Sequence, residues 1–164
     1  HVINMSLGTE EPDHDNSIAI ADAVADAAAN NPDMVMVAAA GNSYDQLPTW
    51  PAALPNVTAV AALTQTNQPT VWSKHGWWID VSTTGEGIVS TFVPGEELKT
   101  ADSDPDTWGN KDPIAVWTGT SFAAPRVSAA IAVGVGKGRT PTDALDDLKA
   151  TGTAIPDWGV AVTI

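Results

Sequence analysis

Runs of apolar residues alternate with polar turns along the whole chain. Residues 34–40 are all apolar, and residues 57–63 are apolar apart from Thr58. Such unbroken runs are typical of strands in a parallel sheet that is covered on both faces. Before them, residues 2–7 predict a first core strand, and a helix is expected over about residues 16–30. Strand, helix and strand within so short a distance predict a βαβ unit and an α/β fold.

The later part of the chain predicts shorter elements. No internal repeat, linker or second domain is visible, so residues 1–164 are expected to form a single domain. Trp50-Pro51 is a candidate for a cis peptide bond. The predicted elements are extended pieces at 71–73 and 77–81, a strand at 88–93, a segment at 115–117, a helix from Ser121, a helix at about 142–150 and an apolar tail at 158–164.

A small hydroxyl residue stands where a Gly-Thr turn meets an Ala-rich run. The segment reads Gly119-Thr120-Ser121-Phe122-Ala123-Ala124-Pro125, and the residues after it predict a buried helix. Proline is tolerated in the first turn of a helix, so Pro125 predicts that Ser121 lies at or just before the helix N-terminus. Free backbone N–H groups and the positive end of the helix dipole suit a nucleophilic oxygen there. The alternative is that Ser121 only caps the helix.

An amide side chain follows the buried strand predicted at 34–40. Asn42 comes directly after Gly41, and ligands of open α/β sheets bind outside the carboxyl ends of the strands. Asn42 and Ser121 are 79 positions apart, yet both are expected at this edge of the sheet. Asn42 Nδ2 and the Ser121 backbone N–H would then be two donors for an oxyanion, as acyl transfer requires.

The charge of the chain limits its partners. Twenty acidic residues against seven basic ones give a net charge of −13, which excludes nucleic acid and anionic membrane surfaces. No apolar run reaches about 18 residues, so no membrane insertion is expected. The chain has no cysteine, and no cofactor is predicted. The acidic stretch at 94–113 predicts a solvated loop; a structural calcium site is the alternative, but the acids lack EF-hand spacing.

Three blocks stand in a fixed order along the chain. They are Val2-Ile3-Asn4-Met5-Ser6-Leu7-Gly8, Ala38-Ala39-Ala40-Gly41-Asn42 and Gly119 to Pro125. They resemble the subtilisin-like serine protease (subtilase) family. The resemblance implies a three-layer α/β fold, with a mainly parallel sheet, helices on both faces and the family's N-terminal part lacking. It also implies a serine endopeptidase domain with Ser121 as the nucleophile, Asn42 as the oxyanion-hole side chain and no metal in the reaction.

The resemblance further implies how an extended peptide or protein substrate is held. One segment looks like the edge strand with which the peptide pairs by β-augmentation. Another looks like a wall of the pocket for the residue before the scissile bond. Secretion is implied by the family alone. The implied substrate-binding residues are Ser6, Leu7 and Gly8 of the strand, Ala39, Ala40 and Gly41 of the wall, and Thr120 beside the nucleophile.

The main departure from the family is an absence. The family's catalytic Asp and His lie upstream of the block at 2–8, where this chain begins. We therefore expect the chain alone to have little or no peptidase activity. Of His1, His14 and His75, only His14 has acidic neighbours, but it is expected in a surface loop and not as a catalytic base. At 82–85, Ser-Thr-Thr-Gly replaces an Ala-Pro-Gly turn of the family.

Two other functions stay open at this point. The chain can be a non-catalytic peptide-binding or regulatory module derived from a subtilase, or an unrelated α/β domain in which the helix at Ser121 binds an anion. A degenerate binder has no reason to keep both Asn42 and Ser121, which favours the peptidase. A domain without its N-terminal part would expose apolar edges, so the expected partners are that missing remainder or a second copy of the chain.

Overall fold

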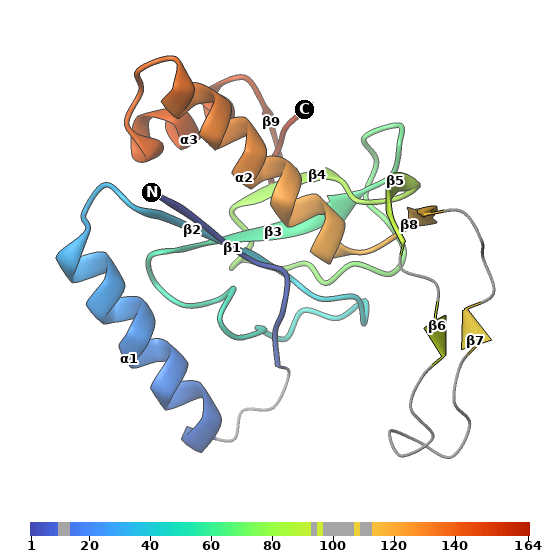
Figure 1. Ribbon diagram of the computed structural model, residues 1–164, viewed down its shortest axis with the longest axis horizontal. Helices are drawn as coiled ribbons and strands as arrows, with labels where there is room; N and C mark the ends of the chain where they lie inside the picture. The colour runs from blue at the N-terminus through green and yellow to red at the C-terminus, as the bar shows by residue number, and fades with distance from the viewer. Residues whose placement is uncertain (10–13, 93–94, 97–106, 109–112) are drawn as a thin grey trace.

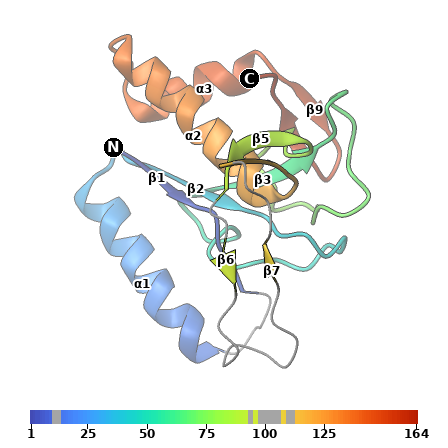
Figure 2. The same ribbon diagram turned by 45° about the vertical axis from the view of Figure 1, so that its right-hand side comes forward.

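A six-stranded sheet lies between two helical layers in the computed structural model (Figures 1 and 2). The structure describes residues 1–9, 14–92, 95–96, 107–108 and 113–164. The helices are α1 (His14–Asn30), α2 (Thr120–Gly136) and α3 (Pro141–Ala150). The strands are β1 (Val2–Met5), β2 (Val35–Ala39), β3 (Val57–Leu63), β4 (Val81–Thr84), β5 (Ile88–Thr91), β6 (Gly95–Glu96), β7 (Thr107–Trp108), β8 (Ile114–Trp117), β9 (Thr153–Ile155) and β10 (Gly159–Ala161).

The main sheet has the strand order β1-β2-β3-β4-β10-β9. Its first five strands run parallel, and β9 alone pairs antiparallel, with β10. The pairs β5–β8 and β6–β7 form two separate antiparallel ribbons. Because β1, β2 and β3 are parallel neighbours, their carboxyl ends meet at one edge of the sheet. The mainly parallel, three-layer α/β fold expected from the sequence is confirmed.

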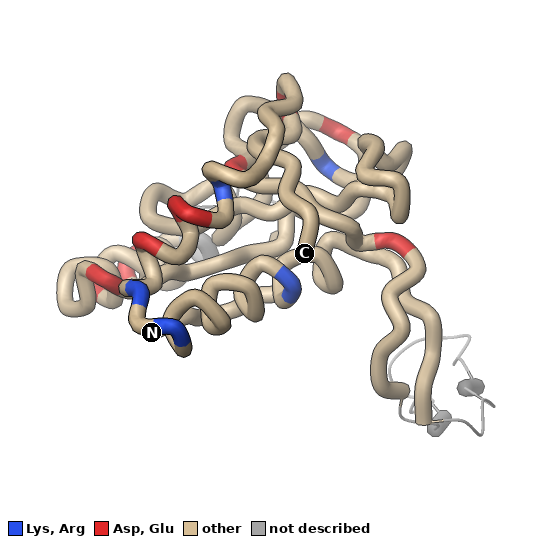
Figure 3. The backbone as a smooth tube through the Cα atoms, turned by 90° about the horizontal axis from the view of Figure 1, so that it is seen from above, with Lys and Arg blue, Asp and Glu red and all other residues tan. Residues whose placement is uncertain are grey.

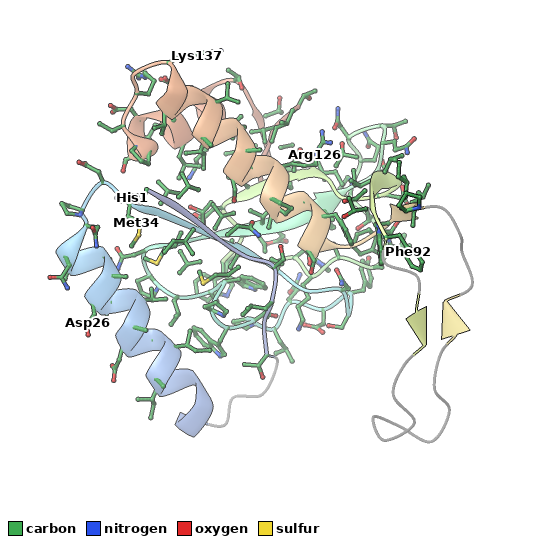
Figure 4. The ribbon with its side chains drawn as sticks, viewed as in Figure 1. His1, Asp26, Met34, Phe92, Arg126 and Lys137 are labelled. Atoms are coloured by element: carbon green, nitrogen blue, oxygen red, sulfur yellow. The ribbon has the colours of Figure 1, made fainter. Side chains whose placement is uncertain are left out.

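The core is divided by the sheet into two apolar layers. Successive side chains of a strand point to opposite faces. In β2, Met36 and Ala38 therefore pack on the side of α1, while Val37 and Ala39 pack on the side of α2 and α3. Both faces are covered, which is why the residues of β2 and β3 are buried throughout. Met34 lies where α1 meets the sheet (Figure 4).

The first strand is an edge strand and not a core strand, which corrects the expectation for residues 2–7. Among the described strands it pairs with β2 alone, and it ends at Met5. Ile3 is 41% exposed and Leu7 is 58% exposed. A strand with a neighbour on one side only keeps one row of backbone groups available for pairing. Residues 6–8 follow the strand and lead to the site described below.

The sequence was also misleading around residues 77–85. No strand forms at 71–73 or 77–80; the strand is β4, which includes Ser82 and Thr83 where a turn was expected. Both residues are fully buried. Thr83 Oγ1 donates a hydrogen bond to the carbonyl of Val162 at 2.9 Å, so its hydroxyl is satisfied inside the core. The apolar tail at 158–164 supplies β10, which pairs with β4.

The helices begin earlier than the sequence predicts. Helix α1 starts at His14, so this residue belongs to the helix and not to the loop before it. Helix α2 starts at Thr120, which makes Pro125 its sixth residue and places the proline in the second turn. Helix α3 is capped by Thr140, whose hydroxyl accepts the Asp143 N–H at 3.1 Å. The Trp50-Pro51 peptide bond is cis, as the sequence suggested.

The charged residues of the described structure are mostly exposed, with Lys74 as a fully buried exception. Figure 3 shows acidic residues spread along several separate segments. Within the described ranges, no helix combines the length and the apolar character needed to cross a bilayer. Most of the acidic stretch at 94–113, with its expectation of a solvated loop or a calcium site, lies outside the described residues.

Candidate active site

Three segments meet at the carboxyl edge of the parallel sheet. Residues 6–8 continue β1, Gly41-Asn42 follows β2, and the first turn of α2 faces them both. The structure therefore brings Ser121 and Asn42 to the same place, although 79 residues separate them in the chain. This is the edge at which α/β sheets bind ligands.

Thr120 fixes the orientation of the Asn42 carboxamide. Asn42 Oδ1 accepts one hydrogen bond from the Thr120 N–H and another from Thr120 Oγ1, both at 3.0 Å. Thr120 Oγ1 in turn accepts the N–H of Gly41 at 3.0 Å. Because the oxygen of the amide faces Thr120, the Nδ2 group points the other way. Nδ2 has no acceptor in the described part of the chain, and it lies beside Gly119, where an added Cβ would be 3.5 Å from it.

Ser121 is the second residue of α2 and is half-buried. The N–H groups of a first helical turn have no carbonyl partner within the helix. The Thr120 N–H is taken by Asn42, while the Ser121 N–H has no acceptor among the described residues. The Ser121 hydroxyl donates to the carbonyl of Ser6 at 3.3 Å. Ser121 N–H and Asn42 Nδ2 are thus two free donors beside one hydroxyl, which is the arrangement that an oxyanion hole requires.

A cavity of about 200 Å³ opens beside Ser121. No charged side chain lines it, although the chain carries 20 acidic residues. A Cβ on Gly8 would lie 2.5 Å from Thr49 Cγ2, so only glycine permits this close approach of the two walls. The Thr49 hydroxyl is buried and has no hydrogen-bond partner in the described structure. The lining residues are Leu7, Gly8, Ala39, Gly41, Asn42, Thr49, Thr120 and Ser121.

The cavity contains most of the predicted substrate-binding residues, but not all of them. Ala40 is fully buried in the apolar layer on the α1 side of the sheet, so its side chain does not line the cavity. Ser6 lies just outside and contacts Ser121 through its side chain and its carbonyl. Thr49 was not found from the sequence, because no local pattern shows that residues 8 and 49 meet across the cavity.

Backbone hydrogen bonds tie the two walls of the cavity together. The N–H of Thr9 donates to the carbonyl of Trp50 at 2.9 Å, and the N–H of Trp50 donates back at 3.1 Å. Leu7 and Gly8, just before this bridge, have no backbone hydrogen bond to any other described residue. Their N–H and C=O groups are therefore available to an extended peptide.

An ion pair between a buried lysine and a partly exposed aspartate supports the loop that carries Asn42. Lys74 is fully buried, and its Nζ donates to Asp45 Oδ1 at 2.7 Å. Its backbone N–H donates to the carbonyl of Gly41 at 2.9 Å. Gly41 has φ of 109°, and a Cβ there would lie 2.9 Å from Lys74 Cδ, so residue 41 must be glycine. The hydrogen bond from Lys74, helped by the N–H of Leu47, lowers the pKa of the Asp45 carboxyl, and partial burial opposes this.

No base reaches the Ser121 hydroxyl within the described residues. His75 stacks on Trp158 with the ring centroids 5.4 Å apart, and it is not part of the cavity lining. His1 precedes β1, at the opposite end of a strand that separates it from Ser6 by about 16 Å. Nothing is described of the side chain of His14. In the described part of the chain, Asp, Glu and His side chains also form no group of three that could hold a metal ion.

A larger cavity of about 520 Å³ lies at the other edge of the sheet. It is lined by the amino ends of β2 and β3 and by residues of α1 and α3. Its charged groups, Asp80 and Lys149, are 4.0 Å apart and face each other. Thr142 contributes a hydroxyl near the start of α3, but in the described structure no amide side chain of the lining accepts hydrogen bonds from a helix start as Asn42 does from Thr120. The smaller cavity is therefore the better candidate for chemistry.

Comparisons with known proteins show the family of the chain. The model of the subtilase family of peptidases matches residues 1–149. A thermophilic serine proteinase of Bacillus sp. (strain AK1) is 32% identical over 129 residues, which are 79% of this chain and 28% of that protein. The extracellular basic protease of Dichelobacter nodosus is 30% identical over 156 residues, which are 92% of this chain and 24% of that protein.

Two solved protease structures share the fold of this chain. A protease from Pseudoalteromonas arctica PAMC 21717 superimposes with a TM-score of 0.78 at 27% identity, covering 99% of this chain and 48% of that one. A lanthipeptide protease at 18% identity shares the fold, with a TM-score of 0.76. The chain spans less than half the length of these two relatives from Bacillus and Dichelobacter, and about half the length of the Pseudoalteromonas protease. With the family model matching most of its residues, the chain belongs to the subtilase family.

Proposed function

We propose that this chain carries the nucleophile and the oxyanion hole of a serine endopeptidase. The observation that carries the proposal is the pair of hydrogen bonds from Thr120 to Asn42 Oδ1. They leave Asn42 Nδ2 and the Ser121 N–H as two free donors in the described structure. A carbonyl oxygen that lies between these donors gains negative charge as the tetrahedral intermediate forms. Donors that are already fixed stabilise this charge without reorganising.

The proposed reaction is acyl transfer through Ser121. Its Oγ forms a bond to the carbonyl carbon of the substrate, and its proton passes to a general base. The C–N bond then breaks, and the base returns the proton to the leaving amine. Water hydrolyses the acyl-enzyme in the same way and regenerates the hydroxyl. The base in this proposal is a histidine, oriented by an aspartate, that lies outside these 164 residues, so the chain alone has little or no activity.

The proposed substrate is an extended peptide or protein. It pairs with the free backbone groups of Leu7 and Gly8, next to Ser6, by β-augmentation. The side chain before the scissile bond enters the cavity of about 200 Å³. The uncharged lining supports a preference for neutral side chains of small or medium size. The Dichelobacter relative is named as an extracellular protease, which supports secretion of this protein as well.

Covalent labelling tests the proposal. An alkyl fluorophosphonate should label Ser121 in the complete protein that contains this chain, and Ser121→Ala should abolish the labelling. Asn42→Ala should slow peptide hydrolysis by about 100- to 1,000-fold, a range measured in subtilisins for loss of one oxyanion-hole donor. The isolated 164-residue chain should turn over peptide at a far lower rate than the complete protein.

A peptide-binding module without catalysis is the competing function. It predicts that the complete protein binds an extended peptide, but that no fluorophosphonate adduct forms on Ser121. Mass spectrometry of the protein after treatment, together with a binding isotherm for a fluorescent peptide, separates the two functions. A bound peptide without an adduct would overturn the peptidase proposal.

A further inference from the structure

Pro125 leaves one carbonyl of α2 without its helical partner. In an α-helix the carbonyl of residue 121 would accept the N–H of residue 125, but proline has no N–H. The carbonyl concerned therefore belongs to Ser121 itself. The structure supplies a substitute: Ser6 Oγ donates to this carbonyl at 2.9 Å. A side chain from the end of β1 thus takes the place of a backbone donor in the first turn of α2.

The Ser6 hydroxyl belongs to a chain of four polar groups. Asn4 Nδ2 donates to Ser6 Oγ at 2.9 Å, and Ser128 Oγ donates to Asn4 Oδ1 at 3.0 Å. A carbonyl can only accept, so Ser6 must use its single proton on Ser121. Ser6 must then accept from Asn4, which turns the amide nitrogen toward Ser6 and the amide oxygen toward Ser128. The Ser121 carbonyl therefore fixes the direction of the hydrogen bonds at Ser6 and Asn4. At the far end, Ser128 Oγ also lies 3.2 Å from the carbonyl of Ala124, which competes with Asn4 Oδ1 for its single proton.

We propose that Ser6, Asn4 and Ser128 form a positioning network for the nucleophile. The inference rests on the proposed function of Ser121 and extends it to residues that do not touch the reacting atoms through their side chains. The network ties the second residue of α2 to the strand along which the substrate lies. Ser6 is the central member, because it contacts Ser121 directly.

The bond from the Ser6 hydroxyl is the one that persists through the reaction. Ser6 and Ser121 exchange two hydrogen bonds, since Ser121 Oγ also donates to the Ser6 carbonyl at 3.3 Å. When Ser121 Oγ is acylated it has no proton, and its bond to the Ser6 carbonyl is lost. The bond from Ser6 Oγ to the Ser121 carbonyl does not involve the reacting atom. It can hold residue 121 in place in both the free and the acylated state.

A double-mutant cycle tests this network in the complete protein. The rate of adduct formation with an alkyl fluorophosphonate is measured for the native protein, Ser6→Ala, Pro125→Ala and the double variant. Ser6→Ala should lower the maximal rate of adduct formation about tenfold, as expected for one lost hydrogen bond, with little change in the concentration giving half-maximal rate. In the Pro125→Ala background the new N–H of residue 125 replaces the lost donor, so Ser6→Ala should then cost less than about twofold.

Three further variants sharpen the test. Ser6→Thr keeps a hydroxyl and should retain most of the rate, and Asn4→Ala should lower it less than Ser6→Ala does. Ser90→Ala removes a hydroxyl of β5 that takes no part in the network and should leave the rate unchanged. An equal loss from Ser6→Ala in the native and in the Pro125→Ala backgrounds would overturn the proposal, because the proline would then be irrelevant.

A second readout separates the network from the proposed function. If the native protein forms no adduct at all, the peptidase proposal fails, but the carbonyl hydrogen bond can still be observed. With ¹³C in the serine carbonyls, Ser6→Ala should move the Ser121 carbonyl resonance upfield, and Pro125→Ala should move it back. An unmoved resonance in Ser6→Ala would overturn the network independently of any chemistry at Ser121.

Discussion

Thr120 holds the Asn42 carboxamide through two hydrogen bonds to one oxygen, both 3.0 Å long. The same threonine accepts the N–H of Gly41 at 3.0 Å, so it joins the first turn of α2 to the loop after β2. An asparagine held only by its own backbone could turn its amide over. Here a turned amide would place Nδ2 against the Thr120 N–H, two donors facing each other, which is unfavourable.

Thr120→Val tests the importance of this arrangement. Valine keeps the shape of threonine, but it removes one of the two donors to Asn42 Oδ1 and leaves the partly buried N–H of Gly41 without its acceptor. We expect the rate of Ser121 adduct formation to fall about tenfold, in line with the cost of one or two hydrogen bonds. Thr120→Ser keeps the hydroxyl and is the matched control. Equal rates for the valine and serine variants would show that the hydroxyl does not orient Asn42.

The Lys74–Asp45 pair predicts an asymmetric loss of stability. The Lys74 side chain is 1% exposed, whereas that of Asp45 is 36% exposed. Removing Asp45 leaves an ammonium group buried, but removing the charge of Lys74 leaves a carboxylate that water can reach. We expect Asp45→Ala to cost about 2–3 kcal/mol of unfolding free energy, below the range for fully buried pairs because Asp45 is partly solvated. Lys74→Met should cost less. Urea unfolding followed by tryptophan fluorescence gives both values, and the reverse order would contradict the prediction.

The same pair predicts a loss of stability in acid. The pKa of the Asp45 carboxyl is lowered below its ordinary value of 3.8, chiefly by the hydrogen bond from Lys74. A carboxyl with a lower pKa in the folded state contributes stability above the ordinary pKa, and the contribution is lost as pH falls through the folded value. Native protein should therefore lose stability below about pH 4. The Asp45→Asn variant has no carboxyl at this position, so its free energy of unfolding should fall less over the same pH range. Urea unfolding of both proteins measures the difference.

The buried hydroxyl of Thr49 predicts a variant that is more stable than the native protein. Thr49 is 3% exposed, and its Oγ1 has no partner in the described structure. Thr49→Val removes the unpaired polar atom and keeps the methyl group that packs against Gly8. We expect a gain of about 1 kcal/mol in the free energy of unfolding. Thr49→Ser, which keeps the hydroxyl and loses the methyl, should be destabilised, and a loss of stability in the valine variant would contradict the prediction.

The main sheet could be predicted because its signals are local. The unbroken apolar run at 34–40 reflects burial on both faces of β2, and that burial is the reason for the run. The position of Asn42 after this run and of Ser121 at a helix start then follow from the same pattern. Alternation along the strand also places the side chains of Ala39 and Ala40 on opposite faces, so the burial of Ala40 away from the cavity is consistent with the same pattern.

The remaining features depend on contacts between distant segments. Thr83 is polar, yet it lies in a core strand because the carbonyl of Val162, 79 residues later, accepts its proton. Lys74 would be expected at the surface, but its side chain is buried and its ammonium group pairs with the partly exposed Asp45. Ser6 exchanges hydrogen bonds with Ser121, which lies 115 positions later in the chain. No local pattern contains these partners.

The paired backbone hydrogen bonds between Thr9 and Trp50 join the two sides of the cavity beside Ser121. Because these bonds resist separation of the two sides, we expect the cavity not to widen readily for a bulky group. To accept a larger substrate side chain in this cavity, Thr49 would have to be replaced by a smaller residue. Inhibitors whose side chain needs a wider cavity should therefore bind weakly, even when their reactive group is well placed for Ser121.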